Sequence, residues 1–517
     1  MKILLANPPR RYAHGDGTET VTIVAGSRWP HQFRRKIGQK PDYSPFPLYM
    51  AYAAAMLERV AGVQVFVRDS IALDEGELEF MSSVHQVKPD AFFFEPATIT
   101  LEEDLRVCRN LRTLYPAIRI VVGGIHASAM PAETVKLAEG AIDSCIVGEY
   151  EESLVELVER LRDGLKLAKY VAGRKFAFRP GVWPARHLFP TNGSPDFKCY
   201  HDGFITRRPS ATLHASRGCI TNCDFCTEIS LIEKKYVMRD VGDICDEIEL
   251  LTTQGIQEVY FDDSIFTGSR RHVLDFCREM KHRGLHHRVS WSAMCAFMGG
   301  TDEELLMEMA RAGCIGVKFG IDSADEKVLK EIGKPLKPER LMALCKVCND
   351  LGIKCHGTLA IGHFADTPET VLKTLQFAGR ISCDTMQFST VTPYPGTPLH
   401  EKLKAAGRLR STDWRDFNGL SASVILWSNG LTAEKLDELV KHGEREWMRT
   451  RLLDPLWWWR QWRFFLRVLP GGGWRLVLRR LRQLWQVCPL DLKQGALLVS
   501  VSMALFFFLL WAYLSPY

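Results

Sequence analysis

Three cysteines, Cys219, Cys223 and Cys226, are the feature that most constrains what this chain can fold into. Three residues separate the first pair and two separate the second. Thiolates this close in sequence can converge on one metal centre. A structural zinc ion normally takes four protein ligands, and the motif contains no fourth cysteine or histidine. The spacing therefore favours an iron–sulfur cluster that leaves one iron open to a small molecule.

Residues 1 to 150 alternate short apolar segments with helical patterns. This alternation is typical of an α/β domain with a doubly wound parallel sheet. The predicted strands are Lys2–Ala6, Val63–Val67, Ala91–Glu95, Ile118–Val122 and Ser144–Val147, and two of the predicted helices are Leu48–Val60 and Leu101–Leu114. Ligands of such sheets bind outside the carboxyl ends of the strands. The candidate ligand-binding residues at those ends are Asn7, Pro8, Gly123, Gly124, His126, Gly148 and Glu149, and the end of the third strand reads Glu95-Pro96-Ala97-Thr98.

Residues 151 to 208 begin with an acidic helix, Glu151–Arg162, and continue into a segment with several prolines and glycines, which predicts a connection between domains. From 209 to 410 the strand–helix rhythm returns. The predicted strands are Ala211–Ala215, Glu258–Asp262, Val289–Ala293, Gly316–Ile321, Cys355–Ile361 and Met386–Val391. Six such units predict a partial (βα)6 barrel whose strand ends face the ligand, and the cysteine motif follows the first strand.

The cysteine motif inside such a barrel, behind a domain with Asn-Pro-Pro, Gly-Gly-x-His and Gly-Glu at its strand ends, resembles the cobalamin-dependent radical S-adenosylmethionine (SAM) methyltransferases. The resemblance covers residues 1 to 410. It implies a [4Fe–4S] cluster on Cys219, Cys223 and Cys226, with SAM on the open iron. It places Phe225 beside the adenine of SAM.

The same resemblance implies further SAM contacts at the strand ends. The residues concerned are Asp262, Asp263, Asp322, Ser323 and Gly362. Asp262 or Asp263 stands where the family often has Gly-Gly-Glu, and a carboxylate there can accept hydrogen bonds from the SAM ammonium. Asp322 stands where the cobalamin-dependent relatives usually have a glutamate. Each carboxylate has an alternative interpretation as a helix cap or loop stabiliser.

The amino-terminal domain departs from the cobalamin domains that ligate cobalt from below. Those domains carry Asp-x-His-x-x-Gly after the first strand, whereas this chain reads Arg10-Arg11-Tyr12-Ala13-His14-Gly15. We therefore expect cobalamin bound without a histidine as the lower ligand. His126 is interpreted as a structural histidine in preference to a cobalt ligand, and loss of cobalamin binding by a degenerate domain is the alternative for the whole region.

The implied activity is methylation of an unactivated carbon, in which SAM yields a 5′-deoxyadenosyl radical and cobalamin carries the methyl group. An electron donor such as ferredoxin or flavodoxin is expected. Two alternatives remain open: a related radical enzyme that cyclises or couples carbons without methyl transfer, and a non-catalytic membrane-bound sensor. Cys345, Cys348 and Cys355 suggest a second metal site, although small core residues are the favoured interpretation.

The carboxyl-terminal region carries the basic charge of the chain. The net charge is +5, but residues 449–482 contain nine arginines and one aspartate, so the rest of the chain is negative. Residues 411–490 are predicted to be helical, with tryptophan and arginine interleaved from Leu456 to Trp485. Such segments suit the bilayer interface, and nucleic acid is the other partner that they could bind.

Residues 495–514 decide between these partners, because they form an uncharged run of 20 residues. At about 1.5 Å per residue, a helix of this length spans the hydrocarbon core. We therefore expect a transmembrane helix and no nucleic acid partner, with a buried helix or a membrane-embedded hairpin as alternatives. The preceding arginines and the many cysteines place the catalytic body in the cytoplasm. The anchor favours a membrane lipid substrate of isoprenoid or hopanoid type.

Overall fold

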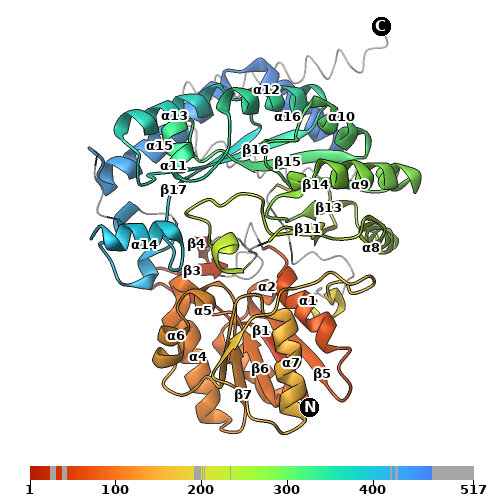
Figure 1. Cartoon of the computed structure of the whole chain (residues 1–517), viewed down its shortest axis with the longest axis vertical. Coiled ribbons are helices and arrows are strands. Elements are labelled where there is room, and N and C mark those ends of the chain that lie inside the picture. The colour runs from red at the N-terminus through yellow and green to blue at the C-terminus, as the bar shows by residue number, and fades with distance from the viewer. Residues whose placement is uncertain are drawn as a thin grey trace.

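The computed structural model of the chain describes residues 1–23, 31–37, 44–190, 200, 202, 204–232, 235–419, 422–425 and 429–468. Two α/β units stack along the long axis of the molecule (Figure 1). Each is built around its own six-stranded parallel sheet. The predicted α/β class, with an open sheet followed by a partial barrel, is confirmed.

The amino-terminal sheet has the strand order β5-β1-β6-β7-β8-β9. Its strands are β1 (Lys2–Asn7), β5 (Gln64–Asp69), β6 (Ala91–Phe94), β7 (Arg119–Val122), β8 (Ser144–Val147) and β9 (Tyr170–Ala172). The helices are α1 (Leu48–Leu57), α2 (Ser70–Leu73), α3 (Glu77–Val87), α4 (Leu101–Leu114), α5 (Ile125–Ala129), α6 (Pro131–Leu137) and α7 (Glu151–Arg162). The order steps outward in both directions from β1 and β6, as in a doubly wound sheet.

Successive strand residues face opposite sides of this sheet, and each side buries its own core. Ile3, Leu5 and Phe93 pack with α1 and α7 on one face. Leu4 and Phe92 pack with α3 and α4 on the other. Because both faces are buried, the strands read as continuous apolar runs, and this is why their positions could be predicted.

The second sheet has the order β10-β13-β14-β15-β16-β17, all parallel. Its strands are β10 (Ser210–Leu213), β13 (Glu258–Phe261), β14 (Ser290–Met294), β15 (Cys314–Gly320), β16 (Lys354–Ile361) and β17 (Thr385–Thr390). The intervening helices are α8 (Val241–Thr253), α9 (Arg270–His282), α10 (Glu303–Arg311), α11 (Glu326–Glu331), α12 (Pro338–Asp350), α13 (Pro368–Arg380) and α14 (Pro398–Ala405). β10 and β17 are the two edge strands of this sheet and do not pair with each other. The barrel is therefore partial, as predicted.

A three-stranded antiparallel sheet follows β1 and was not predicted. It consists of β2 (Arg11–Ala13), β3 (Thr18–Ile23) and β4 (His31–Lys36). Some buried positions of this sheet are charged. Glu19 is only 4% exposed and forms ion pairs with Arg11 and Arg35. Buried charges of this kind remove the apolar–polar alternation by which strands are recognised.

The segment predicted as a connection contributes to the first sheet, since β9 pairs with β8. The predicted acidic helix is α7. Further along this segment, the side chain of Arg186 contacts the barrel. Its guanidinium donates to Glu247 Oε1 on α8 at 2.5 Å. The connection is therefore folded onto both units.

Two helices follow the barrel, α15 (Ala433–Leu452) and α16 (Pro455–Val468). Trp457 is 5% exposed and donates its indole N–H to the backbone oxygen of Asp384, while Arg460 pairs with the Asp384 carboxylate at 3.3 Å. No helix within the described residues is long and apolar enough to cross a membrane. The predicted transmembrane helix at 495–514, and residues 469–490 of the predicted helical region, lie outside the described residues.

Candidate functional site

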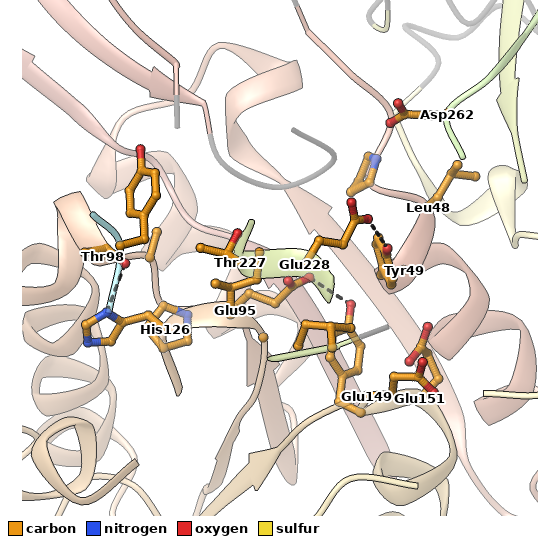
Figure 2. Close-up of a pocket in the computed structure, with 18 of the residues that line it drawn as sticks. Leu48, Tyr49, Glu95, Thr98, His126, Glu149, Glu151, Thr227, Glu228 and Asp262 are labelled. Carbon is orange, nitrogen blue, oxygen red and sulfur yellow. Dashed lines mark hydrogen bonds between the residues drawn. The ribbon is translucent and has the colours of Figure 1, made fainter. Parts of the chain in front are cut away.

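A cavity lies where the carboxyl ends of both sheets meet, and both units line it (Figure 2). The amino-terminal unit contributes the segments after β6, β7 and β8 and the start of α1. The barrel contributes His214, Asp262, Tyr394 and the residues just after the cysteine motif, Thr227 and Glu228. The sequence predicted ligand sites at these two sets of strand ends, and the fold brings the two sets together.

Glu95, which directly follows β6, lines this cavity; the sequence placed it at a strand end but assigned it no cofactor contact. Its Oε1 accepts a hydrogen bond from the Tyr150 hydroxyl at 2.8 Å. Burial raises the pKa of the Glu95 carboxyl from 4.5 to about 7. Gly124 has φ +90°, and a Cβ there would lie 3.0 Å from the Glu95 carboxylate, so glycine is required for this close approach. Glu95 is therefore partly protonated at neutral pH.

The remaining predicted residues of the amino-terminal unit divide into lining and supporting positions. Gly124, His126 and Glu149 line the cavity. Buried Asn7 donates to Asp69 at 2.9 Å and accepts from Arg10 at 2.6 Å, so its side chain braces the end of β1. Three further residues support the site without lining it. Pro8 is buried, and a Cβ on Gly123 would lie 3.2 Å from the Tyr150 Cβ. The backbone N–H of Gly148 donates to the Ser128 hydroxyl.

His126 is 1% exposed, and its Nδ1 lies 3.1 Å from the Thr98 hydroxyl (Figure 2). The Trp414 ring packs edge-on against it at 5.5 Å. Burial lowers the pKa of His126 to about 4, so the imidazole is neutral at physiological pH. These contacts hold the ring in place within the protein and support the structural interpretation.

The cysteine motif forms a loop after β10 and the short β11 (Ser216–Arg217). Gly218 opens it with φ +80°, and a Cβ there would lie 2.2 Å from the Lys235 oxygen. The Thr221 hydroxyl lies 3.1 Å from Cys219 Sγ and 3.6 Å from Cys223 Sγ. Cys219, Cys223 and Cys226 form no disulfide within the described residues and have intermediate exposure. The three thiols are therefore held in one loop and remain accessible to a cluster.

A lysine that the sequence analysis missed lies beside these cysteines. Lys334, between α11 and α12, forms an ion pair with Asp322, and both side chains are 10% exposed. Asp322 directly precedes Ser323 at the end of β15 and has φ +60°, a conformation rare for aspartate. Burial raises the pKa of the Cys223 thiol, while the nearby Lys334 lowers it. Lys334 thus provides positive charge where cluster thiolates carry negative charge.

Phe225 is 8% exposed, and its ring lies 5.2 Å from the ring of His363. His363 follows Gly362 after β16 and is 1% exposed. Neither nitrogen of His363 has a hydrogen-bond partner among the described residues. Gly362 has φ +88°, and its N–H and that of His363 both donate to the Asp366 carboxylate. The turn therefore presents an unsatisfied imidazole beside the predicted adenine contact.

The other predicted SAM residues of the barrel differ in what they contact. Asp262 lines the cavity. Asp263 is fully buried and accepts from the Ala215 N–H at 2.9 Å and the Ser216 hydroxyl at 2.6 Å, so it fixes β11 to the end of β13. The Ser323 hydroxyl accepts from the Asp325 N–H at 3.1 Å. The contacts of Asp263 support the loop-stabiliser alternative that the sequence left open for each carboxylate.

Cys345, Cys348 and Cys355 are fully buried in the barrel core, where α12 packs on β16. In the part of the chain that the structure describes, no group of three or more His, Cys, Asp or Glu side chains could hold a metal ion. That finding concerns single ions, whereas each cysteine of a four-iron cluster binds a different iron. The core interpretation of Cys345, Cys348 and Cys355 is the one that their burial supports.

The residues present fit the cofactors that the sequence implies. The cysteine loop offers three cysteine side chains outside any disulfide, with the Lys334 cation nearby, as a cluster requires. His363 offers buried ring nitrogens that a purine can satisfy. Gly124 lines the cavity with a positive φ angle and no side chain, so a large ligand can approach its backbone closely.

Comparison with known proteins agrees with this geometry. The B12 binding domain family matches residues 34–158, and the Radical SAM superfamily matches residues 213–378. A cytidylyl-2-hydroxyethylphosphonate methyltransferase from Streptomyces wedmorensis is 30% identical, over 68% of this chain and 77% of that protein. An uncharacterised methyltransferase from Pyrococcus horikoshii is 27% identical, over 85% of this chain and 91% of that protein.

Two further proteins extend the comparison. A hopanoid C-2 methylase from Rhodopseudomonas palustris is 24% identical, over 64% of this chain and 60% of that protein. The structure of the radical SAM methyltransferase TsrM from Kitasatospora setae, with tryptophan and a SAM analogue bound, covers 80% of this chain and 77% of its own, with a TM-score of 0.59 and 21% identity. The protein described here belongs to the cobalamin-dependent radical SAM methyltransferases, whose cofactors are a [4Fe–4S] cluster, SAM and cobalamin.

Proposed function

We propose that the protein methylates an unactivated carbon of a neutral membrane lipid of isoprenoid or hopanoid type. The cluster and SAM supply a hydrogen-abstracting radical, and cobalamin supplies the methyl carrier. The observation that carries the choice of substrate is the charge of the cavity. Five carboxyl groups line it, and none of the described lining residues is a lysine or an arginine. The five are Glu95, Glu149, Glu151, Glu228 and Asp262.

Such a lining disfavours an anionic substrate. Arg217 neutralises Glu151 from outside the lining, and Glu95 is partly protonated near pH 7. The remaining carboxyl groups still give the cavity a negative potential. Placing a like charge beside them costs several kcal/mol, which disfavours a phosphate or carboxylate group in the part of the substrate that contacts these residues. A neutral, largely apolar substrate has no such cost, and apolar residues such as Leu48, Ile125 and Ile232 line the same cavity.

The carboxyl-terminal sequence supports a membrane location for the substrate. Exposed Leu453, Leu456 and Trp459 surround the start of α16. The tryptophan- and arginine-rich run and residues 495–514 follow in the sequence. An enzyme on the bilayer meets a dissolved lipid at a high effective concentration. The hopanoid type rests on similarity to the hopanoid methylase alone. We further propose cytoplasmic ferredoxin or flavodoxin as the electron donor.

The test compares two substrates of one shape. The reconstituted full chain receives SAM, a reductant and a pentacyclic triterpenoid in detergent micelles, or the same triterpenoid carrying a carboxylate. We expect a product heavier by one methyl group from the neutral lipid only. A product without added mass would indicate cyclisation or coupling, and absence of 5′-deoxyadenosine would indicate a non-catalytic protein. Equal turnover of both lipids, or full-rate methylation of a water-soluble metabolite, would refute the lipid assignment.

A further inference from the structure

Arg217 connects the cysteine loop to the other unit of the protein. It ends β11, two residues before Cys219, and is only 2% exposed. Its side chain leaves the barrel and enters the amino-terminal unit. There Nη1 donates to Glu151 Oε1 at 2.5 Å, at the first residue of α7. The side chains of Arg217 and Glu151 are 2% and 0% exposed, so the ion pair is desolvated.

Aromatic rings of the amino-terminal unit surround the same guanidinium. Its central carbon lies 3.8 Å from the ring centre of Phe176, 4.5 Å from that of Tyr49 and 5.1 Å from that of Tyr52. A planar guanidinium stacks on aromatic faces and forms directional hydrogen bonds at its edge. The side chain of Arg217 therefore binds in a site that the aromatic rings and the Glu151 carboxylate of the amino-terminal unit form.

The far side of the cysteine loop contacts one of the same residues. Glu228, two residues after Cys226, accepts a hydrogen bond from the Tyr49 hydroxyl at 2.8 Å (Figure 2). Tyr49 on α1 thus contacts Arg217 before the loop through its ring and Glu228 after the loop through its hydroxyl. Both ends of the cysteine loop are fixed to the B12-binding domain within a few residues of the predicted cluster ligands.

We propose that Arg217, with Glu151 and Tyr49, is a positioning residue that sets the distance and orientation of the cluster loop relative to the bound cobalamin. Cleavage of SAM needs only the barrel and its cluster, whereas methyl transfer needs both cofactors at a fixed separation. Arg217 therefore acts on the coupling between the two reactions. The inference uses the cofactors of the family and does not depend on the lipid substrate.

The test is Arg217→Lys in the full chain reconstituted with cluster and cobalamin. Lysine keeps the charge but cannot stack as a plane or hold the same directed bond. Arg283→Lys is the control, because Arg283 follows α9 and pairs with Asp246 on α8 and Glu279 on α9, both in the barrel. The measurements need no substrate. They are 5′-deoxyadenosine formation from SAM with dithionite, the distance distribution between cob(II)alamin and the reduced cluster by pulsed EPR, and hydrogen exchange of the start of α7.

In Arg217→Lys we expect SAM cleavage within about twofold of the wild type. The distance distribution should lengthen or broaden, and exchange at the start of α7 should accelerate about tenfold. Arg283→Lys should leave the distance distribution unchanged. An unchanged distribution in Arg217→Lys would overturn the proposal. If Arg217→Lys fails to fold, Tyr49→Phe is measured instead, because phenylalanine keeps the ring beside Arg217 and loses the hydrogen bond to Glu228. An unchanged distance distribution in Tyr49→Phe would also overturn the proposal. Absence of SAM cleavage in the wild type would instead refute the proposed activity.

Discussion

Replacing Glu95 with glutamine tests the electrostatics of the cavity. Burial raises the pKa of this carboxyl from 4.5 to about 7 in the folded protein. One pKa unit corresponds to about 1.36 kcal/mol, so ionising Glu95 in the fold costs about 3 kcal/mol. Water reaches the half-buried carboxyl from the cavity and reduces this cost to about 2 kcal/mol. Glutamine keeps an acceptor for the Tyr150 hydroxyl but carries no charge at any pH.

The sign of the pH dependence follows from the raised pKa. Between pH 4.5 and 7 the folded state binds the proton more tightly than the unfolded state does. The stabilisation is complete below the lower value and is lost as the pH rises through the higher one. From about pH 5 to about pH 8, the wild type should therefore lose about 2 kcal/mol of stability relative to Glu95→Gln.

Hydrogen exchange of the β6 peptide measures this difference in the protein without its cofactors, because it reports the free energy of opening one unit of a multidomain chain. Comparing the two proteins at each pH cancels the titration of all other groups. As a second variant, Tyr150→Phe removes a hydrogen bond that favours the charged form and should raise the pKa of Glu95 further. Parallel pH curves for wild type and Glu95→Gln would refute the assignment of a proton to Glu95 at neutral pH.

Four further predictions follow from the site and the tail. Replacing all three cluster cysteines with alanine should abolish iron–sulfur absorbance and SAM cleavage, and retained cleavage would contradict the cluster assignment. EPR of the cob(II)alamin form should show no nitrogen splitting from a histidine; a splitting that His126→Ala or His14→Ala removes would show a cobalt ligand. His363→Phe should raise the KM for SAM about tenfold at unchanged cluster content, and an unchanged KM would exclude a SAM contact. A chain ending at Val468 should leave the membrane fraction yet remain folded, and such a protein still found in the membrane would exclude the anchor. A chain ending at Arg451 should also lose stability, because it lacks Trp457 and the Arg460 ion pair with Asp384.

Much of the fold could be predicted because most strands of the first sheet are buried on both faces and those of the second are buried on at least one. Their strands are short apolar runs with turns after them, and these mark the carboxyl ends where ligands bind. The β2–β4 sheet could not be predicted in this way, since its buried positions carry Glu19 and Arg35 as an ion pair. Prediction from hydrophobic patterns assigns charged positions to the surface, although an ion pair between two charged side chains allows both to be buried.

The site shows the same limit at the level of single residues. Sequence position identified the strand ends but could not say which of two adjacent carboxylates faces the ligand. Because neighbouring backbone directions differ, Asp262 lines the cavity while Asp263 bonds the Ala215 N–H. Lys334 lies 12 residues from Asp322 and in no motif, so only the packed loop reveals the pair. Arg217 stands next to the cysteine motif, yet its partners, such as Glu151, are 66 residues away and belong to another domain.

The docking of α16 also constrains how a lipid would reach the cavity. Trp457 and Arg460 bind Asp384, which precedes β17 and therefore lies at the amino end of the barrel strands. The cavity lies at their carboxyl ends. A strand of seven residues spans about 23 Å, so a bilayer that contacts Leu453, Leu456 and Trp459 is separated from the cavity by roughly the height of the barrel. A lipid substrate must then leave the bilayer to react, because the reacting carbon cannot be reached from the hydrocarbon core. The same separation makes micellar substrate the suitable form for the assay. For the proposed lipid substrate, the tail would then serve to raise the local concentration and would not form part of the binding site.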